Sequence, residues 1–297
     1  MNDTYTDVCS SIENTPKNTG AGSQCLEAVT VMIYLLKQGF AFDSVEDFKS
    51  KTKWEEAVTA KNAVPLYEMY ELTPNNTEAV FYESRNFRKE TSKAVKITDW
   101  EAYLGFCSHS ALKSYENSEY SRVVEVTDDG DLIGIYAPDG IGVTGQLLSQ
   151  FEVGIRVIAT SEKPAYSPVT MTYDNYEELE DGAVFVTPDF NPVTGLEGVF
   201  DINITQSGSA TSSLVTFTAF AGCNNVVVAG LETIIVLLDD SGIEQAGVAV
   251  ADVGNGTYTA TATASIVSGT ISTNGVQTLP LWGDLLVEGS APVVVTP

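Results

Sequence analysis

The sequence predicts an α+β front domain, an antiparallel β-meander with a few helices, followed by an all-β sandwich. Two observations support this division. Apolar residues recur at helical spacing only in the front part of the chain. In the back part, short runs of alternating apolar residues are separated by turn residues. All 15 Lys and Arg residues lie at or before Lys163, and residues 164–297 carry only acids as charged side chains. Because this asymmetry indicates two differently built modules, we expect an extended N-terminal arm over 1–24, the α+β domain over 25–180, a linker over 181–196 and the sandwich over 197–297.

Three helices are expected in the front domain. The first rests on apolar residues at helical spacing, closed by Gly39. The second begins at Ser44, an N-cap candidate that has Asp47 three residues further on. The third rests on apolar residues spaced by three and four. Their predicted ranges are Leu26–Leu36, Ser44–Lys61 and Trp100–Tyr115.

After residue 120 the hydrophobic pattern changes from helical spacing to the short runs and turns of strands. Asp129-Gly130 and Asp139-Gly140 stand between short apolar runs and predict two tight turns, because Asp-Gly tolerates the positive φ angles of a hairpin. A half-buried strand is expected over Phe151–Thr160, where alternate apolar residues through Ile155 and Val157 would face inward. Another strand is expected over Val169–Tyr173. These strands make the front domain a meander with its helices on one face.

The part behind residue 196 is almost wholly β in pattern. About seven short apolar runs follow one another over roughly 100 residues, separated by turn sequences such as Gly254-Asn255-Gly256. Turns at this frequency are typical of a sandwich of the immunoglobulin type, which is the fold class we expect for residues 197–297.

Composition excludes several classes of function. The net charge of −25 argues against a nucleic-acid-binding surface, which needs Lys and Arg to displace counterions, and equally against docking on an anionic membrane. Four cysteines without a C-x-x-C spacing predict buried free thiols in a reducing cytoplasm. We therefore expect no sequence-specific nucleic acid, no membrane and no metal or other cofactor as partner.

No residue pattern predicts an enzyme. His109 is the single histidine and is expected to be structural rather than a catalytic base. The acids from Glu177 to Asp181 have no fixed separation and are interpreted as a solvated linker rather than a glycosidase pair. Asp128–Asp131 has Ca²⁺-type ligands but not the spacing of an EF-hand, so a hairpin turn is preferred.

One short segment concentrates the positive charge. Five of the 15 bases lie within twelve residues, next to the apolar run Ala79–Tyr82. These candidate assembly residues are Arg85, Arg88, Lys89, Lys93 and Lys96. One interpretation is a solvated hairpin loop. The other is a basic arm that lies on an acidic neighbouring copy of the same chain, as in a ring or tube.

Two resemblances add to this reading. Gly254–Thr261, GNGTYTAT, resembles a signature of bacterial and phage Ig-like repeats of the invasin kind. The segments Lys51–Tyr67, Asn75–Ser84, Phe106–Tyr115 and Val126–Gly134 resemble phage virion structural proteins, and their order is similar to that of a tail tube protein.

The resemblances imply a non-enzymatic structural subunit of a bacteriophage virion, made in the bacterial cytoplasm. Such a subunit would be a self-assembling tail tube protein with an exterior Ig-like domain, and its partners would be copies of itself and other virion proteins. The alternatives left open are a capsid-associated decoration protein and a surface adhesin or carbohydrate-binding module. In the last case the Ig-like domain would bind host-surface glycans.

Overall fold

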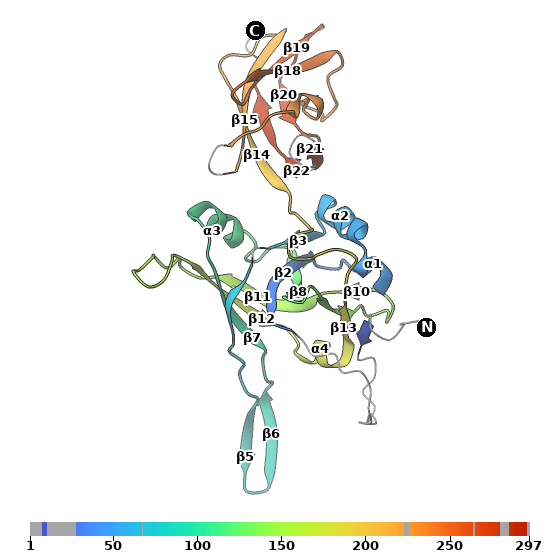
Figure 1. Cartoon of the computed structure of the whole chain (residues 1–297), viewed down its shortest axis with the longest axis vertical. Coiled ribbons are helices and arrows are strands. Elements are labelled where there is room, and N and C mark those ends of the chain that lie inside the picture. Colours follow the sequence, from blue (N-terminus) through green and yellow to red (C-terminus); the bar gives the residue numbers. More distant parts are fainter. Residues whose placement is uncertain are drawn as a thin grey trace. The chain divides into compact units, whose positions relative to one another are not determined.

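The computed structural model describes residues 8–10, 28–66, 68–222, 226–263, 265–279 and 285–295, without the side chains of 8–10, 180 and 181. The described part of the chain is mostly β, with 48% of its residues in strands and 11% in helices. It divides into two compact units, Met1–Leu196 and Glu197–Pro297, which are described separately (Figure 1). No helix in the described ranges is long and apolar enough to cross a membrane.

The first unit contains one large antiparallel sheet. Its strands run in the order β1-β13-β9-β8-β11-β12-β7-β4; β2 pairs with β8 and β3, β10 pairs with β9, and β5 and β6 form a separate two-stranded sheet. The elements are β1 (Val8–Ser10), β2 (Thr30–Lys37), α1 (Val45–Lys49), α2 (Lys51–Thr59), β3 (Ala63–Pro65), β4 (Tyr70–Pro74), β5 (Val80–Ser84), β6 (Phe87–Ser92), β7 (Ile97–Ala102), α3 (Phe106–Lys113), β8 (Tyr120–Thr127), β9 (Leu132–Tyr136), β10 (Val143–Thr144), β11 (Gln146–Val153), β12 (Ser167–Tyr173), α4 (Glu177–Gly182) and β13 (Ala183–Val186).

Helices α1 and α2 confirm the helical pattern predicted from Ser44 onward. The Ser44 side chain accepts a hydrogen bond from the Asp47 backbone N–H at 3.1 Å, as an N-cap does. The single predicted helix is broken at Ser50, whose ψ of 122° is extended. Trp54 on α2 is fully buried, and its ring lies 4.9 Å from that of Tyr34 on β2. This aromatic contact fixes α2 to the sheet.

The helix predicted over Leu26–Leu36 is wrong, because residues 30–37 form strand β2. Apolar residues three and four positions apart also occur within an uninterrupted apolar run. Over a segment this short, periodicity alone therefore does not distinguish a helix from a buried strand. β2 is buried along most of its length, which is typical of a strand covered on both faces, and it begins with the β-branched residues Thr30 and Val31. Gly39, at a φ of 84°, makes the turn after the strand instead of ending a helix.

Two further boundaries differ from the sequence pattern. The helix expected over Trp100–Tyr115 is confined to α3, because Trp100 is a buried residue of β7 paired with Val169 of β12. The strand expected over Phe151–Thr160 ends at Val153, and Ile155 is 89% exposed instead of facing inward. The regular β11–β12 ladder is interrupted at Gly154, whose N–H still donates to the Pro168 carbonyl at 2.9 Å, and pairing resumes only at the isolated bridge between Val157 and Tyr166.

The turns of the meander follow the sequence. The Asp129-Gly130 turn joins β8 to β9, with Gly130 at a φ of 88°, and the Asp139-Gly140 turn joins β9 to β10. The strand predicted over Val169–Tyr173 is confirmed as part of β12.

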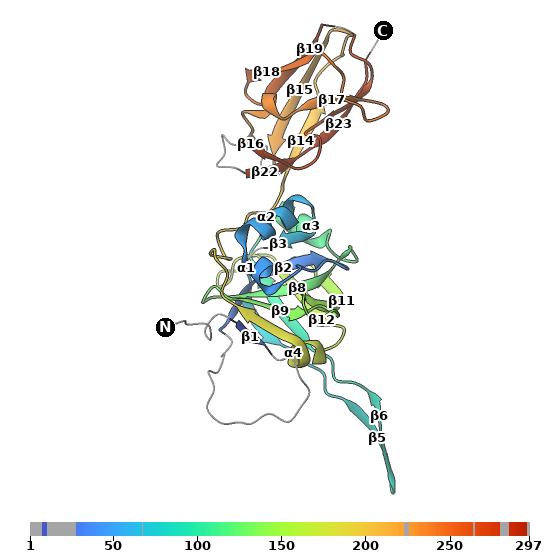
Figure 2. The same cartoon turned by 90° about the vertical axis from the view of Figure 1, so that its right-hand side faces the viewer.

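Residues 181–196, expected as a linker, belong to the first unit. β13 within this segment pairs with β9 on one side and with β1 on the other, and Leu196 is buried. Of the arm expected over 1–24, only the backbone of β1 lies within the described residues. β1, labelled in Figure 2, is the outermost strand at this end of the large sheet, next to β13.

The second unit is built of two sheets that contribute to one core. One has the order β18-β19-β15-β14-β22-β21, with β16 on β15, and the other has the order β17-β20-β23. Its elements are β14 (Phe200–Gln206), β15 (Leu214–Ala221), β16 (Val226–Val227), a 3-10 turn (Leu231–Thr233), β17 (Val236–Asp239), β18 (Val248–Gly254), β19 (Thr257–Ala262), β20 (Gly269–Ser272), β21 (Gln277–Leu279), β22 (Leu285–Glu288) and β23 (Ser290–Val293).

The GNGTYTAT segment lies at the β18–β19 turn. Asn255 and Gly256 both have positive φ angles, 53° and 72°, as a tight hairpin turn requires. Tyr258 follows on β19 and is fully buried; its ring stacks on Phe217 at 5.6 Å and its hydroxyl donates to the Val228 carbonyl at 2.5 Å. Tyr258 is therefore a core residue of the second unit.

Candidate assembly surface

A long β arm extends from the edge of the first unit. β4 pairs with β7 at the end of the large sheet, and the ladder continues outward because Asn75 N–H donates to the Ile97 carbonyl at 2.8 Å and Thr77 pairs with Val95. The β5–β6 hairpin, residues 80–92, lies beyond this stem. Figures 1 and 2 both show it projecting away from the body of the unit. Backbone hydrogen bonds thus determine the direction in which the hairpin points.

The hairpin has no core of its own. Every residue of β5 and β6 is exposed, including the large apolar side chains Val80, Phe81, Tyr82 and Phe87. An isolated two-stranded hairpin is marginally stable in water, and clustered exposed aromatic side chains mark interaction sites. The hairpin therefore adds little to the stability of the unit and presents apolar surface to solvent.

A β-bulge separates the hairpin from its stem. Val80 pairs with Ser92 and Phe81 with Glu90, so Thr91 is the extra residue of β6. The Thr91 hydroxyl donates to the Val80 carbonyl at 3.0 Å and fixes the bulge. Bulges bend a strand and increase its twist, so this residue sets the angle between the hairpin and the stem.

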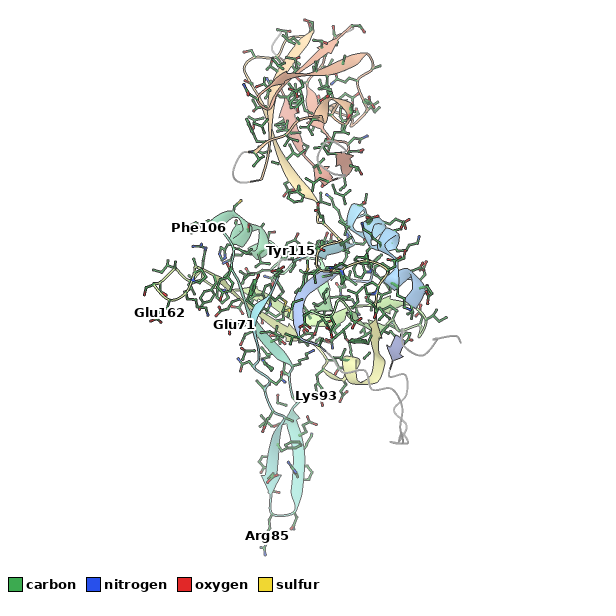
Figure 3. The ribbon with its side chains drawn as sticks, in the orientation of Figure 1. Glu71, Arg85, Lys93, Phe106, Tyr115 and Glu162 are labelled. Carbon is green, nitrogen blue, oxygen red and sulfur yellow. The ribbon has the colours of Figure 1, made fainter. Side chains whose placement is uncertain are left out.

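The five predicted assembly residues separate into two groups. Arg85 lies at the tip of the hairpin and Lys93 at its base, as labelled in Figure 3, and Arg88 and Lys89 lie between them on β6. Lys96 instead belongs to the body of the unit. Four of the five are thus brought together on the arm, and the fifth is not.

Lys96 takes part in an internal polar network. Its Nζ donates to Glu125 Oε1 at 3.2 Å and to Gln146 Oε1 at 3.1 Å, and it lies 4.2 Å from the centre of the Tyr173 ring. The Lys96 side chain is 25% exposed and that of Glu125 16%. Burial, with the Glu125 carboxylate as second cause, raises the pKa of Tyr173 well above its ordinary value, so its hydroxyl stays protonated and donates to Glu125. This network holds the root of β7 to β8 and β12.

A second exposed apolar area lies in the same unit and was missed by the sequence pattern. Ile155 and Ile158 on the loop after β11 are largely exposed, as is Phe106 at the start of α3. Arg156 lies between them: its guanidinium is 4.2 Å from the centre of the Phe106 ring and donates to the Leu104 carbonyl at 3.3 Å. Of these residues, alternation predicted only Ile155 to face inward; the signal that could have corrected it is Gly154, where the regular ladder is interrupted.

The residues considered for catalysis lie on different elements of the first unit. His109 is half-buried on α3, and its Nδ1 lies 2.8 Å from Ser167 Oγ. The Glu177–Asp181 acids lie on α4, and Asp131 of the β8–β9 turn accepts a hydrogen bond from Thr187 at 2.5 Å. A cleft of about 450 Å³ borders this turn, lined by Asp128, Asp129, Gly130, Thr187 and residues 190–194. Within the described ranges, no group of three His, Cys, Asp or Glu residues is placed to hold a metal ion.

The expectation of buried free thiols is wrong for Cys107. This residue is exposed on α3 and is disulfide-bonded. Its partner is outside the described side chains, as are the other three cysteines. The spacing of cysteines in the sequence does not predict this pairing, because a disulfide forms only between segments that lie close together in the folded chain.

Comparison with known proteins gives no family for this chain. No protein-family model matches it, and no curated protein matches it significantly.

Proposed function

We propose that this chain is a structural subunit of a bacteriophage virion, a tail tube protein that self-assembles through its β arm. The observation that carries the proposal is the β5–β6 hairpin, in which every side chain is exposed and four aromatic or β-branched residues are presented to solvent on a hydrogen-bonded stem. A structure of this kind contributes binding surface rather than core.

Charge supports a copy of the same chain as the partner. Residues 80–93 contain four of the 15 bases and two of the 40 acids, so the rest of the chain carries eleven bases and 38 acids. Among the described residues, Arg85, Lys89 and Lys93 have no ion pair. A cationic arm on an otherwise acidic protein is complementary to the body of its own neighbours, and such complementarity gives specificity and speeds association.

In this proposal the second unit is an Ig-like sandwich on the outside of the assembly. Its two sheets share one core, and Tyr258 after the β18–β19 turn anchors that core. The unit contains no base, so copies of it repel one another and stay apart. In the same proposal the first unit lines the lumen; residues 1–163 carry 25 acids against 15 bases, and this net negative charge would repel DNA phosphates and let DNA pass.

The test is the assembly state of the full chain. Light scattering and negative-stain microscopy of the purified protein should show rings or tubes. In a short-arm variant, residues 79–93 are replaced by Asn-Gly, which closes a two-residue turn between Glu78 and Ala94. This variant should keep the far-UV circular dichroism and melting temperature of the native chain but remain monomeric.

A charge variant tests the electrostatic part with a matched control. Arg85→Glu with Lys89→Glu should block assembly, whereas Lys53→Glu with Lys113→Glu, on the exposed faces of α2 and α3, changes the net charge equally and should leave assembly intact. A native chain that stays monomeric at high concentration refutes the proposal. Native-like assembly of the short-arm variant refutes the role of the arm. Monomers or trimers that bind glycans favour the adhesin.

A further inference from the structure

The β5–β6 pairing gives the hairpin two chemically different faces. Residues directly opposite each other in an antiparallel pair lie on the same face. Phe81 pairs with Glu90 and Glu83 with Arg88, so one face, here named the paired face, consists of Phe81, Glu83, Arg88 and Glu90. Tyr82 pairs with Lys89 and Ser84 with Phe87, so the other face, here named the open face, consists of Tyr82, Ser84, Phe87 and Lys89.

The paired face has internal partners for its main groups. Arg88 Nε lies 2.9 Å from Glu83 Oε1, and the Arg88 guanidinium lies 4.1 Å from the centre of the Phe81 ring. One cation thus neutralises the adjacent carboxylate and partly covers the aromatic ring, which is 41% exposed.

The open face has no such partners. Tyr82 is 59% exposed and Phe87 56% exposed, and within the described ranges neither side chain makes a ring–ring contact, a cation–π contact or a side-chain hydrogen bond. Lys89 makes no ion pair within the same part of the chain. Two aromatic residues around a free cation are the composition found at the centre of protein–protein interfaces, where aromatic side chains are enriched.

We propose that the open face is the surface by which the hairpin docks on a second copy of this chain, and that the paired face remains in solvent. This inference rests on the proposed function and specifies which side of the arm performs it. The docking site is an acid-bearing surface of the second copy rather than its hairpin, because two open faces in contact would place Lys89 against Lys89 near both Arg85 side chains. The contact is therefore heterologous: the hairpin of one copy meets a different surface of the next.

The deciding experiment compares the same substitution on the two faces. Phe87→Ser and Tyr82→Ser should each weaken self-association of the full chain by about tenfold or more, measured as the shift in critical concentration by sedimentation, because buried interface aromatics dominate binding. Phe81→Ser removes the same ring from the same hairpin and should shift that concentration less than about threefold. Melting temperatures equal to that of the native chain show that all three variants are folded.

Two results would overturn the inference while leaving the proposed function standing. The first is equal weakening by Phe81→Ser and Phe87→Ser; the second is native-like assembly of Phe87→Ser when the short-arm variant stays monomeric. If the short-arm variant assembles normally, the proposed function itself has failed.

Mixing tests the heterologous contact. A Tyr82→Ser, Phe87→Ser double variant keeps its acceptor surface, so a small fraction added to the native chain should enter the assemblies and terminate their growth, and microscopy should show shorter particles. Native-length particles that exclude the variant would mean that hairpins pair with hairpins, and this part of the inference would be wrong.

Discussion

Replacing Lys96 by Met tests whether this lysine serves the fold rather than assembly. The substitution keeps most of the side-chain length and removes the charge. It breaks the hydrogen bonds to Glu125 at 3.2 Å and to Gln146 at 3.1 Å, and it removes the cation from the Tyr173 ring. Hydrogen bonds to charged groups contribute about 1.5–3 kcal/mol, and a partly buried cation–π contact adds about 0.5–1 kcal/mol. We expect the first unit to lose about 2–4 kcal/mol of its free energy of unfolding.

The matched control is Lys93→Met, three residues earlier. Lys93 is exposed at the base of the hairpin and has no ion pair in the described part of the chain, so its loss should change stability by less than about 0.5 kcal/mol. Urea unfolding followed by the fluorescence of Trp54 and Trp100, both buried in the first unit, measures the difference. Equal stabilities of the two variants would refute the role given to the Lys96 network.

Four further predictions concern the two cores and the disulfide. Tyr258→Phe keeps the stack on Phe217 but leaves the Val228 carbonyl without its donor; calorimetry should show the second unit destabilised by about 1–3 kcal/mol, and an unchanged transition would contradict the assignment. Burial raises the pKa of Tyr258 to about 12, so its contribution to stability is complete below pH 10 and is lost as the pH rises from 10 toward 12, where the unfolded phenol ionises first; pH-dependent unfolding should show this decline. Trp54→Ala should lower the free energy of unfolding of the first unit by about 3–5 kcal/mol in urea. A loss below about 1 kcal/mol would show that the contact of Trp54 with Tyr34 is not part of the core. Cys107 should resist alkylation until the protein is reduced and then be labelled in a peptide map; labelling without reductant would disprove the disulfide.

Local signals in the sequence predicted local structure well. The Ser44 cap, the two Asp-Gly turns and the Asn255-Gly256 turn each depend on a few neighbouring residues, and the structure has all of them. The predominance of antiparallel strands followed from the same turn residues.

Features that depend on distant partners could not be predicted in this way. β2 is a strand because β3 and β8 pair with it on its two sides, and its own residues fit a helical spacing equally well. Ile155 alternates like a core residue, but the regular pairing of β11 with β12 stops after Val153, and Ile155 is exposed. β13 looked like a linker because the strands that flank it, β1 and β9, lie far away in the sequence.

The candidate assembly surface was predicted in part. The density of cations marked the arm, but the sequence did not separate Lys96, which lies in the body, from the four cations on the hairpin. Which aromatic side chains share a face depends on the register of β5 against β6, and that register is set by the two-residue turn at Arg85-Asn86. This register could not be predicted from composition.

The bulge at Thr91 affects the direction of the hairpin but not the set of side chains on each of its faces. Because a bulge changes the bend and twist of a strand without changing the side chains beyond it, deletion of this single residue would keep Tyr82, Phe87 and Lys89 together while turning them toward a different direction. In the assembly proposed above, inserting or removing one residue at this hinge would therefore change the pitch or diameter of the polymer while leaving the side chains that make the contact unchanged.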